Sequence, residues 1–316
     1  MDLPFGPGLP DGWSIMSVRR NRRSVLHFAV SLIMAGALLL LLLPLGELLH
    51  ADPIVNASPA AISEPILVAA ATPGLSAKAD AASASGLTEL AGRDPMALAR
   101  LALERYERDV REYRCMLIKQ ERVGGKLGPV QEIAVQFRDE PYSVYMTWLK
   151  NVGDSKRALF INTPDYVDSK GRKFAQVEPA GAIIRLFVKK VNIPIRGARA
   201  RSASRRFIDE FGFRSTLDLL LQLHELASKN GVLDLRYGGE SEIDGRPTHF
   251  IVRYLPYAGP NGRYPDAKMV AHFDQETMMP VAVYSYADRA GTELLGSYLF
   301  TQIELNPGFS DQDFQF

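Results

Sequence analysis

The feature that most constrains the fold is an alternation of apolar and polar residues that returns many times after Tyr113. Ile133, Val135 and Phe137, for example, alternate with a set that includes Glu132, Gln136 and Arg138. Later segments repeat the pattern: YSVYMTWLK, RALFIN, KFAQVE, VLDLRYGG, THFIVRYL, KMVAHFD, PVAVYSYA and GSYLFTQIEL. A period of two is typical of strands, and Asn261-Gly262 is a tight-turn dipeptide between two of them. The sequence predicts about nine or ten antiparallel strands.

Some of these strands carry apolar residues on both faces. Val144, Met146 and Trp148 point to one side of their strand, whereas Tyr145 and Leu149 point to the other. A sheet of such strands is covered on one face and partly shielded on the other.

Two helices are expected beside the strands. Asp94 before Pro95 is an N-cap pattern, and apolar residues then recur at three- and four-residue steps, which indicates an amphipathic helix. After Ser215 the pattern S-T-L-D resembles a capping box, and leucines from Leu217 to Leu226 surround the helix axis. We therefore expect an α+β fold: a large curved antiparallel sheet, an N-terminal amphipathic helix, and a buried helix covering the concave face.

The first fifty residues have the polarity of an export signal. Arg19, Arg20, Arg22 and Arg23 precede an uncharged run that is long enough to span a bilayer. We expect a cytoplasmic basic N-terminus at 1–23, a signal peptide or transmembrane anchor at 24–49, a flexible Ala/Pro/Ser linker at 50–93 and a β-rich domain at 94–316. Whether the segment is cleaved stays open, as does a start at Met16 instead of Met1.

This polarity places the protein in the cell envelope. An intact anchor would hold it in the inner membrane with the domain outside the cytoplasm, and a cleaved segment would release it to the periplasm or medium. The 37 Lys and Arg residues balance 36 Asp and Glu residues, which argues against nucleic acid as a partner.

Residues that would carry catalysis or metal binding are sparse. Cys115 is the single cysteine, so no intramolecular disulfide and no thiolate cluster can form, and no cofactor or metal is expected. No serine stands in a nucleophile elbow. His224 falls on a leucine face, as a core histidine would, whereas His249 or His272 leaves open an undescribed hydrolase with a histidine base. We expect no enzyme activity.

The C-terminal segment carries a resemblance to a known superfamily. From Met269 the chain reads as a strand, a turn with Asp274 and Thr277, a strand opened by Pro280, a hairpin and a closing segment that ends at Phe314. This order resembles the LolA and LolB periplasmic lipoprotein carriers and an uncharacterised bacterial family of exported proteins near them. The resemblance implies a half-barrel that holds lipid acyl chains.

Together these features predict non-catalytic binding of a lipid acyl chain or lipoprotein in a cavity between the sheet and the Leu217–Leu226 helix. The candidate cavity residues are Trp148, Leu217, Leu220, Phe250, Tyr284 and Phe300. A basic amphipathic segment could lie on anionic membrane lipids, with candidates Arg185, Lys189, Lys190 and Arg196. The alternative function is an envelope sensor or scaffold that binds a partner protein.

Overall fold

The computed structural model describes residues 81–181 and 187–316. The expected basic N-terminus and the signal peptide or anchor lie outside the described residues, as do residues 50–80 of the expected linker and Arg185. Within the described part, no helix is long and apolar enough to cross a membrane.

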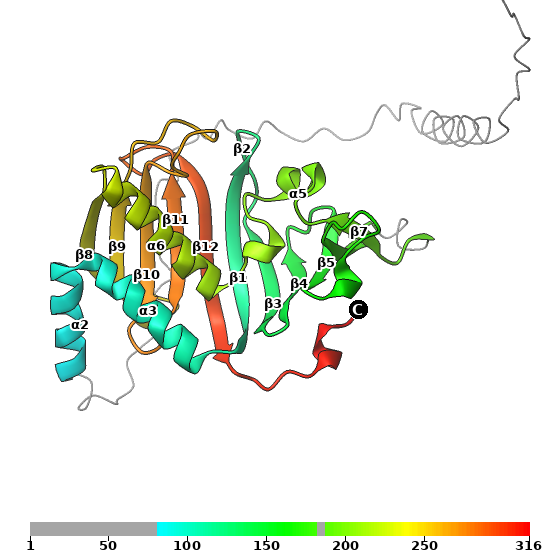
Figure 1. Cartoon of the computed structure of the whole chain (residues 1–316), viewed down its shortest axis with the longest axis horizontal. Coiled ribbons are helices and arrows are strands. Elements are labelled where there is room, and N and C mark those ends of the chain that lie inside the picture. Colours follow the sequence, from blue (N-terminus) through cyan, green and yellow to red (C-terminus); the bar gives the residue numbers. More distant parts are fainter. Residues whose placement is uncertain (1–80, 182–186) are drawn as a thin grey trace, which may run out of the picture. The chain divides into compact units, whose positions relative to one another are not determined.

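The twelve strands of the described residues form one antiparallel sheet (Figure 1). They are β1 (Glu112–Val123), β2 (Lys126–Leu127), β3 (Gln131–Asp139), β4 (Tyr142–Lys150), β5 (Ser155–Ile161), β6 (Phe174–Pro179), β7 (Val191–Pro194), β8 (Asp234–Ile243), β9 (Arg246–Tyr254), β10 (Lys268–Asp274), β11 (Pro280–Tyr286) and β12 (Leu294–Leu305). The order across the sheet is β7-β6-β5-β4-β3-β1-β12-β11-β10-β9-β8, with β2 paired to β1. The two strands beyond the expected ten are β2 and β7, which are too short to show a period of two.

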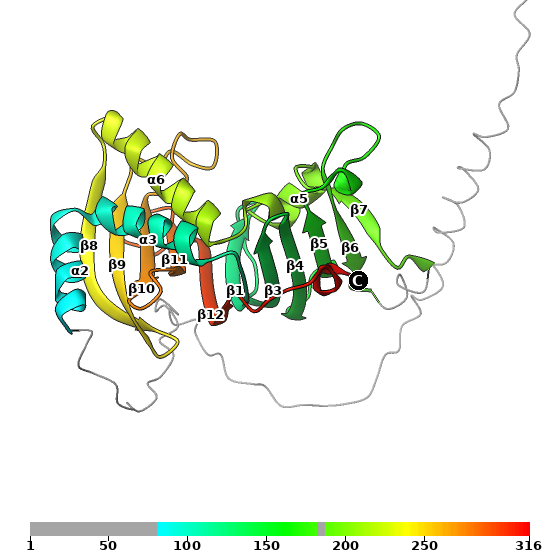
Figure 2. The same cartoon turned by 60° about the horizontal axis from the view of Figure 1, so that its bottom comes forward.

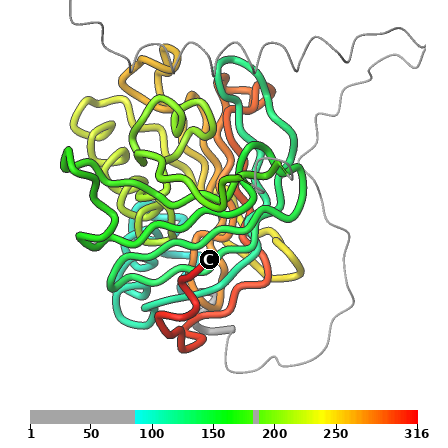
Figure 3. Tube along the Cα trace, turned by 90° about the vertical axis from the view of Figure 1, so that its right-hand side faces the viewer, coloured from blue at the N-terminus to red at the C-terminus, as the bar shows by residue number. Residues whose placement is uncertain are grey.

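The helices lie on one face of this sheet (Figures 1 and 2). They are α2 (Ala81–Arg93), α3 (Pro95–Asp109), α5 (Ala198–Ala203) and α6 (Phe213–Lys229). Three short 3-10 turns complete the described elements: η1 (Pro164–Tyr166), η2 (Ile208–Glu210) and η3 (Asp311–Phe314). The expected fold class is confirmed: an open, curved antiparallel sheet with a helix packed on its concave face. The C-terminal turn η3, red in Figure 3, lies against β4.

Helix α3 begins where the sequence predicts. The Asp94 carboxylate oxygen Oδ1 accepts hydrogen bonds from the backbone N–H groups of Met96 (3.0 Å) and Ala97 (3.2 Å). These bonds satisfy two of the donors that a helix leaves unpaired at its start.

Helix α2 corrects the expected linker, which was predicted to extend to residue 93. Ala81–Arg93 is helical, Ala91 is buried, and Leu87 packs against the core. The Thr88 hydroxyl also donates to the Glu240 carboxylate on β8 at 2.9 Å. Alanine is the strongest helix former, so an Ala-rich composition forms a helix once one side has a surface to pack on.

Helix α6 differs from the prediction in its start and its symmetry. It begins at Phe213 rather than after Ser215, and the Phe213 N–H donates to the Tyr113 hydroxyl at 3.2 Å. Gly212 precedes it with φ +116°, and a Cβ there would lie 3.1 Å from the Phe137 ring. The helix is not apolar all round: its buried residues are Phe213, Leu217, Leu220, His224 and Ala227. Their spacing of three and four marks a single buried face.

The main core lies between α3, α6 and the strands β8 to β12. Helices α3 and α6 run side by side over this half of the sheet (Figure 2). Their fully buried side chains are Leu98, Ala99, Ala102, Tyr106, Phe213 and Leu217. They face a continuous set of strand residues: Ile251, Met269, Ala271, Phe273 and Val281. Apolar packing therefore closes most of this half of the concave face.

Candidate ligand-binding site

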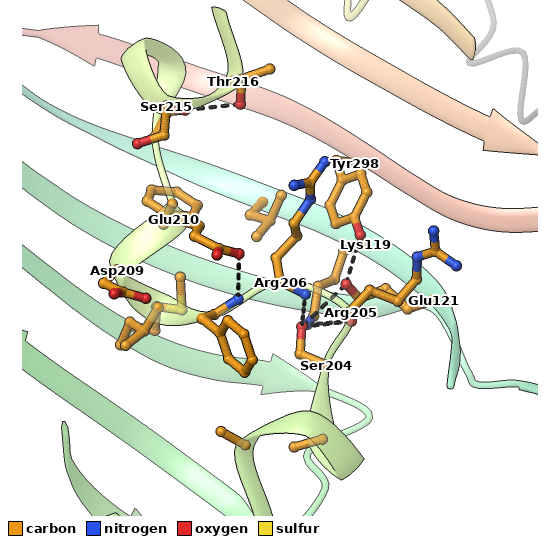
Figure 4. Close-up of a pocket in the computed structure, with 18 of the residues that line it drawn as sticks. Lys119, Glu121, Ser204, Arg205, Arg206, Asp209, Glu210, Ser215, Thr216 and Tyr298 are labelled. Atoms are coloured by element: carbon orange, nitrogen blue, oxygen red, sulfur yellow. Dashed lines mark hydrogen bonds and ion pairs between the residues drawn. The ribbon is translucent and has the colours of Figure 1, made fainter. Parts of the chain in front are cut away.

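A cavity of about 790 Å³ lies over the remaining part of the concave face (Figure 4). Its floor is formed by β1, β3 to β6 and β12, with Arg253 of β9, Met269 of β10 and Val283 of β11 at one end, and its other walls by α6 and the segment from Arg199 to Gly212. This volume is in the range of small-molecule sites, roughly 300–1,000 Å³. The Tyr142 hydroxyl holds the covering segment, because it lies 2.9 Å from the carbonyl oxygens of both Ile208 and Phe211.

The floor is apolar along one row that crosses four neighbouring strands. Phe300 on β12 pairs with Leu117 on β1, Leu117 pairs with Ile133 on β3, and Ile133 pairs with Trp148 on β4. All four side chains line the cavity. Further cavity-lining residues continue the apolar floor across β4, β5 and β6: Met146, Ala158, Ala175 and Val177.

Two residues further along the same strands, the floor becomes polar. Tyr298 on β12 pairs with Lys119 on β1, and Lys119 pairs with Gln131 on β3. Residues two apart in a strand point to the same face and lie roughly 6.6 Å apart. The cavity is therefore amphipathic along the strand direction, with an apolar row beside a polar one.

A hydrogen-bonded cluster occupies the polar row (Figure 4). The Glu121 carboxylate accepts hydrogen bonds from Lys119 Nζ (3.0 Å), Ser204 Oγ (2.8 Å) and the Tyr298 hydroxyl (2.7 Å). Burial alone would raise the pKa of Glu121, but Lys119 and the hydrogen bonds outweigh it and hold the pKa below its usual value. Ser204 thereby ties the covering segment to β1.

This cluster contains a serine next to a lysine, but its bonds do not fit a nucleophile. Lys119 Nζ donates to Ser204 Oγ at 3.2 Å, and Ser204 in turn donates to Glu121. A serine nucleophile needs a base that takes its proton, and a carboxylate with a lowered pKa is a weak base. The arrangement acts as a clamp between the sheet and the covering segment.

A second buried polar group lies where α6 crosses β9. Arg253 lines the cavity with 1% of its side chain exposed, and its Nη2 donates to the Asp266 carboxylate oxygens at 2.9 and 3.1 Å. Its Nε and Nη1 atoms find no acceptor among the described residues. His224 is near, and burial together with the Arg253 charge lowers its pKa to about 3, so its ring is neutral.

The structure brings together three of the six expected cavity residues. Trp148, Leu220 and Phe300 line the cavity, whereas Leu217 belongs to the closed core under α6. Phe250 on β9 and Tyr284 on β11, which were expected to line the cavity, lie on the other face of the sheet.

Successive side chains of a strand point to opposite faces. Ile251 faces the helices and Val283 faces the cavity, so the adjacent Phe250 and Tyr284 point to the convex face. Both pack on the His272 ring, with centroid distances of 5.1 and 5.9 Å. Their assignment to the cavity is wrong, since alternation fixes which residues share a face but not which face is covered.

The basic segment is only partly free to meet a membrane. Lys189 and Lys190 are exposed, and Lys190 Nζ donates to the Gln176 side chain at 3.0 Å. Arg196 is exposed but forms ion pairs with Asp209 (3.0 Å) and Glu210 (3.2 Å). Arg196 therefore holds the covering segment, and its charge is largely neutralised.

The residues considered for catalysis are separated in space. His249 Nδ1 lies 2.9 Å from the Tyr237 hydroxyl, and His272 Nδ1 lies 3.3 Å from the Thr248 hydroxyl, on opposite faces of the sheet. Burial lowers the pKa of His272 to about 4, and neither histidine lines the cavity. Cys115 is buried, which raises the pKa of its thiol. In the described ranges, no cluster of His, Cys, Asp and Glu side chains could hold a metal ion.

Sequence reasoning missed the polar end of the cavity. One signal was visible in strand β1. Its buried face is apolar at Cys115 and Leu117 and becomes charged at Lys119 and Glu121, which indicates a polar site at that end of the strand. Nothing local indicates the pairing of Arg253 with Asp266 or of Ser204 with Glu121, because each joins separate parts of the chain.

The family model described as a protein of unknown function (DUF1571) matches residues 110–316. No curated protein matches the chain. Among solved structures, the fold is similar to a Pseudomonas aeruginosa MucA/MucB complex, at 15% identity and TM-score 0.40, over 71% of this chain but only 61% of that one.

The fold of this chain is also similar to the Mycobacterium tuberculosis lipoprotein LppX, at 17% identity and TM-score 0.36, over 69% of this chain and 98% of that one. A LolA superfamily protein from Nitrosomonas europaea matches at 9% identity and TM-score 0.22, over 69% of this chain and 97% of that one. The family match confirms the expected membership in an uncharacterised family.

Proposed function

The chain belongs to the DUF1571 family of proteins of unknown function, and we propose that its domain binds an apolar ligand, such as a lipid acyl chain or lipoprotein, without catalysing a reaction. The observation that carries this proposal is the cavity of about 790 Å³ with its continuous apolar row. Ligand sites are concave and mainly apolar, with a few polar groups at fixed places.

The covering segment supports the same proposal. Helix α5 has six residues and no buried one, so no apolar face of α5 packs into the cavity. Apolar floor residues without such packing lose dispersion contacts, which an apolar ligand restores. A role as carrier or acceptor of a lipid fits this arrangement better than a role for Ser204 in acyl transfer.

We further propose that the domain works outside the cytoplasm, in or beside the cell envelope. The support is the arginine cluster before the uncharged run from Ser24 to Gly46, a polarity that keeps the basic end inside the cell. Lys189 and Lys190 are the remaining candidates for contact with an anionic membrane surface.

The test is to express the whole chain, separate envelope from cytoplasm, and analyse the purified protein by native mass spectrometry with lipid extraction. We expect the protein in the envelope or periplasmic fraction with a lipid-sized ligand bound. Protein confined to the cytoplasm would contradict the location. A ligand-free protein that instead retains a membrane protein partner would favour a sensor or scaffold.

A matched pair of variants ties the ligand to the cavity. Ala200 on α5 lines the cavity, whereas Ala198 on the same helix is exposed and does not. Ala200→Trp should fill part of the cavity and remove most of the bound ligand, while Ala198→Trp should leave the bound fraction unchanged. Equal occupancy in both variants would place the ligand elsewhere.

A further inference from the structure

The polar end of the cavity carries an excess of positive charge. Lys119 is paired with Glu121 and Arg253 with Asp266. Arg205 and Arg206 also line the cavity, and neither forms an ion pair with a carboxylate in the part of the chain that the structure describes. At this end, Arg205 and Arg206 therefore line the cavity without a carboxylate partner among the described residues. The other lining carboxylates in ion pairs, Asp209, Glu210 and Asp218, are held by Arg196 and Arg214, which do not line it.

Arg253 adds buried donors to this end. It is almost completely buried, yet its Nε and Nη1 hydrogens point to no acceptor within the described residues. A buried charged donor without an acceptor is costly, and in native proteins such groups nearly always find a partner. Because Arg253 lines the cavity, a ligand with acceptor oxygens can supply that partner.

The three arginines belong to one region. Arg205 Nη2 donates to the carbonyl oxygen of Pro265 at 3.4 Å, and Pro265 directly precedes Asp266, the partner of Arg253. Burial raises the pKa of Tyr298, and the charges of Arg206 and Arg205 oppose that rise, so both lie near the Tyr298 hydroxyl. Figure 4 shows Arg205, Arg206 and Tyr298 around the same end of the cavity.

The apolar row starts beside this region. Met269 on β10 and Val283 on β11 line the cavity between Arg253 and Phe300. From β12 to β6 the apolar floor crosses six neighbouring strands, which are separated by five spacings. At about 4.8 Å for each spacing, the floor is roughly 24 Å long across the sheet. Such a floor has room for an extended chain that starts at the arginines and runs across the strands.

Resting on the proposed function, we propose that the ligand is an amphiphile with an anionic head, a carboxylate or a phosphate, which Arg205, Arg206 and Arg253 bind. Its chain lies along the row from Phe300 to Trp148. Arginine suits this role because its planar N–H groups match the oxygens of carboxylates and phosphates. Glu121 and Asp266 are already held by Lys119 and Arg253, so they present little uncompensated negative charge.

The test compares ligands that share one chain and differ in the head. Binding of hexadecanoate, hexadecyl phosphate and hexadecanol to the delipidated full chain is measured by calorimetry. We expect at least one of the two anions to bind at least about tenfold more tightly than hexadecanol, and the tighter anion identifies the head. Equal affinity for all three overturns the anionic head but leaves apolar binding intact. Absence of binding by all three overturns the proposed function itself.

Two variants locate the head. Arg205→Gln/Arg206→Gln changes side chains that are partly or fully exposed and outside the printed ion pairs of the described residues, so folding is retained. The preference for the anion should fall about tenfold while hexadecanol affinity stays constant. Arg253→Met/Asp266→Leu removes both members of the buried pair, because removing one leaves an uncompensated charge.

The Arg253→Met/Asp266→Leu variant should also bind the anion about tenfold more weakly. The control is Arg236→Gln, an exposed arginine on β8 that does not line the cavity, and its affinities should match those of the unchanged chain. An anion preference that survives both cavity variants overturns the assignment of these arginines.

Discussion

The two halves of the sheet share one strand pattern but are covered in different ways. Over β8 to β12, helices α3 and α6 bury nine side chains between them and form a closed core. Over β1 to β6, the cover is the short helix α5 and the turn η2, neither of which buries a residue, and a cavity remains that reaches Met269 and Arg253 at the edge of the closed half.

The difference teaches that the cover, not the strand, decides between core and cavity. At about 1.5 Å per residue, the 15 residues of α3 and the 17 of α6 span roughly 22 to 26 Å, enough to cross four or five strands. The six residues of α5 span roughly 9 Å. Ile251 and Ile133, for example, both point to the concave face of their strands, but helices cover Ile251, whereas Ile133 lines the cavity.

The largest expected effect compares two leucines of one helix. Leu217 is fully buried in the closed core, whereas Leu223 is half-buried and lines the cavity. Leu217→Ala should lower the free energy of unfolding by about 2–5 kcal/mol, because it leaves a void in packed surroundings. Leu223→Ala should cost about 1 kcal/mol, since part of the side chain is already exposed. Urea unfolding of the ligand-free chain measures both, and equal costs would mean that the cavity is closed in solution.

A smaller effect, about 2 kcal/mol, concerns the loss of folding stability in acid. The described histidines all lie on α6, β9 and β10, in the closed half. His224 has a pKa lowered from 6.5 to about 3 by burial and the Arg253 charge, so below pH 6.5 the unfolded chain takes up a proton that the folded chain does not. The stability that the neutral ring contributes is full above pH 6.5 and declines as pH falls toward 3.

From pH 7 to pH 5 the His224 contribution should therefore fall by about 2 kcal/mol. His224→Leu should be less acid-sensitive by that amount, while at pH 7 the two chains should be similar in stability. Hydrogen exchange should show the loss in α6 and β9 before β3 and β4. A variant with the same pH dependence as the unchanged chain would show that His224 is protonated in the fold.

The smallest expected effect sharpens the description of the cavity cover. Ser204→Ala removes the hydroxyl that joins the covering segment to Glu121, which should cost about 1 kcal/mol and speed amide exchange between Arg205 and Gly212. Ser202→Ala is the matched control, because its exposed hydroxyl bonds only to the Arg199 carbonyl oxygen on the same helix. No difference between the two variants would mean that Tyr142 and Arg196 hold the covering segment without help from Ser204.

Much of the fold could be predicted because its signals are local. The N-cap at Asp94 and ten of the strands follow from residues close together in the sequence. The prediction erred where local signals were weak: α2 lies in an Ala-rich stretch, and the S-T-L-D pattern at Ser215 imitated a helix start that the Tyr113 hydroxyl actually fixes two residues earlier.

The sequence by itself determined an antiparallel sheet with apolar residues on both faces, helices to cover it, and a family of unknown function. Only the tertiary structure decided which face holds the cavity, and so separated Trp148 and Phe300 from Phe250 and Tyr284. It also decided the chemistry of the polar end, where Glu121 meets a hydroxyl 177 residues away on Tyr298. The physical reason is that alternation and helical spacing act within one element, whereas strand register and the length of the covering helix set which side chains meet across the sheet.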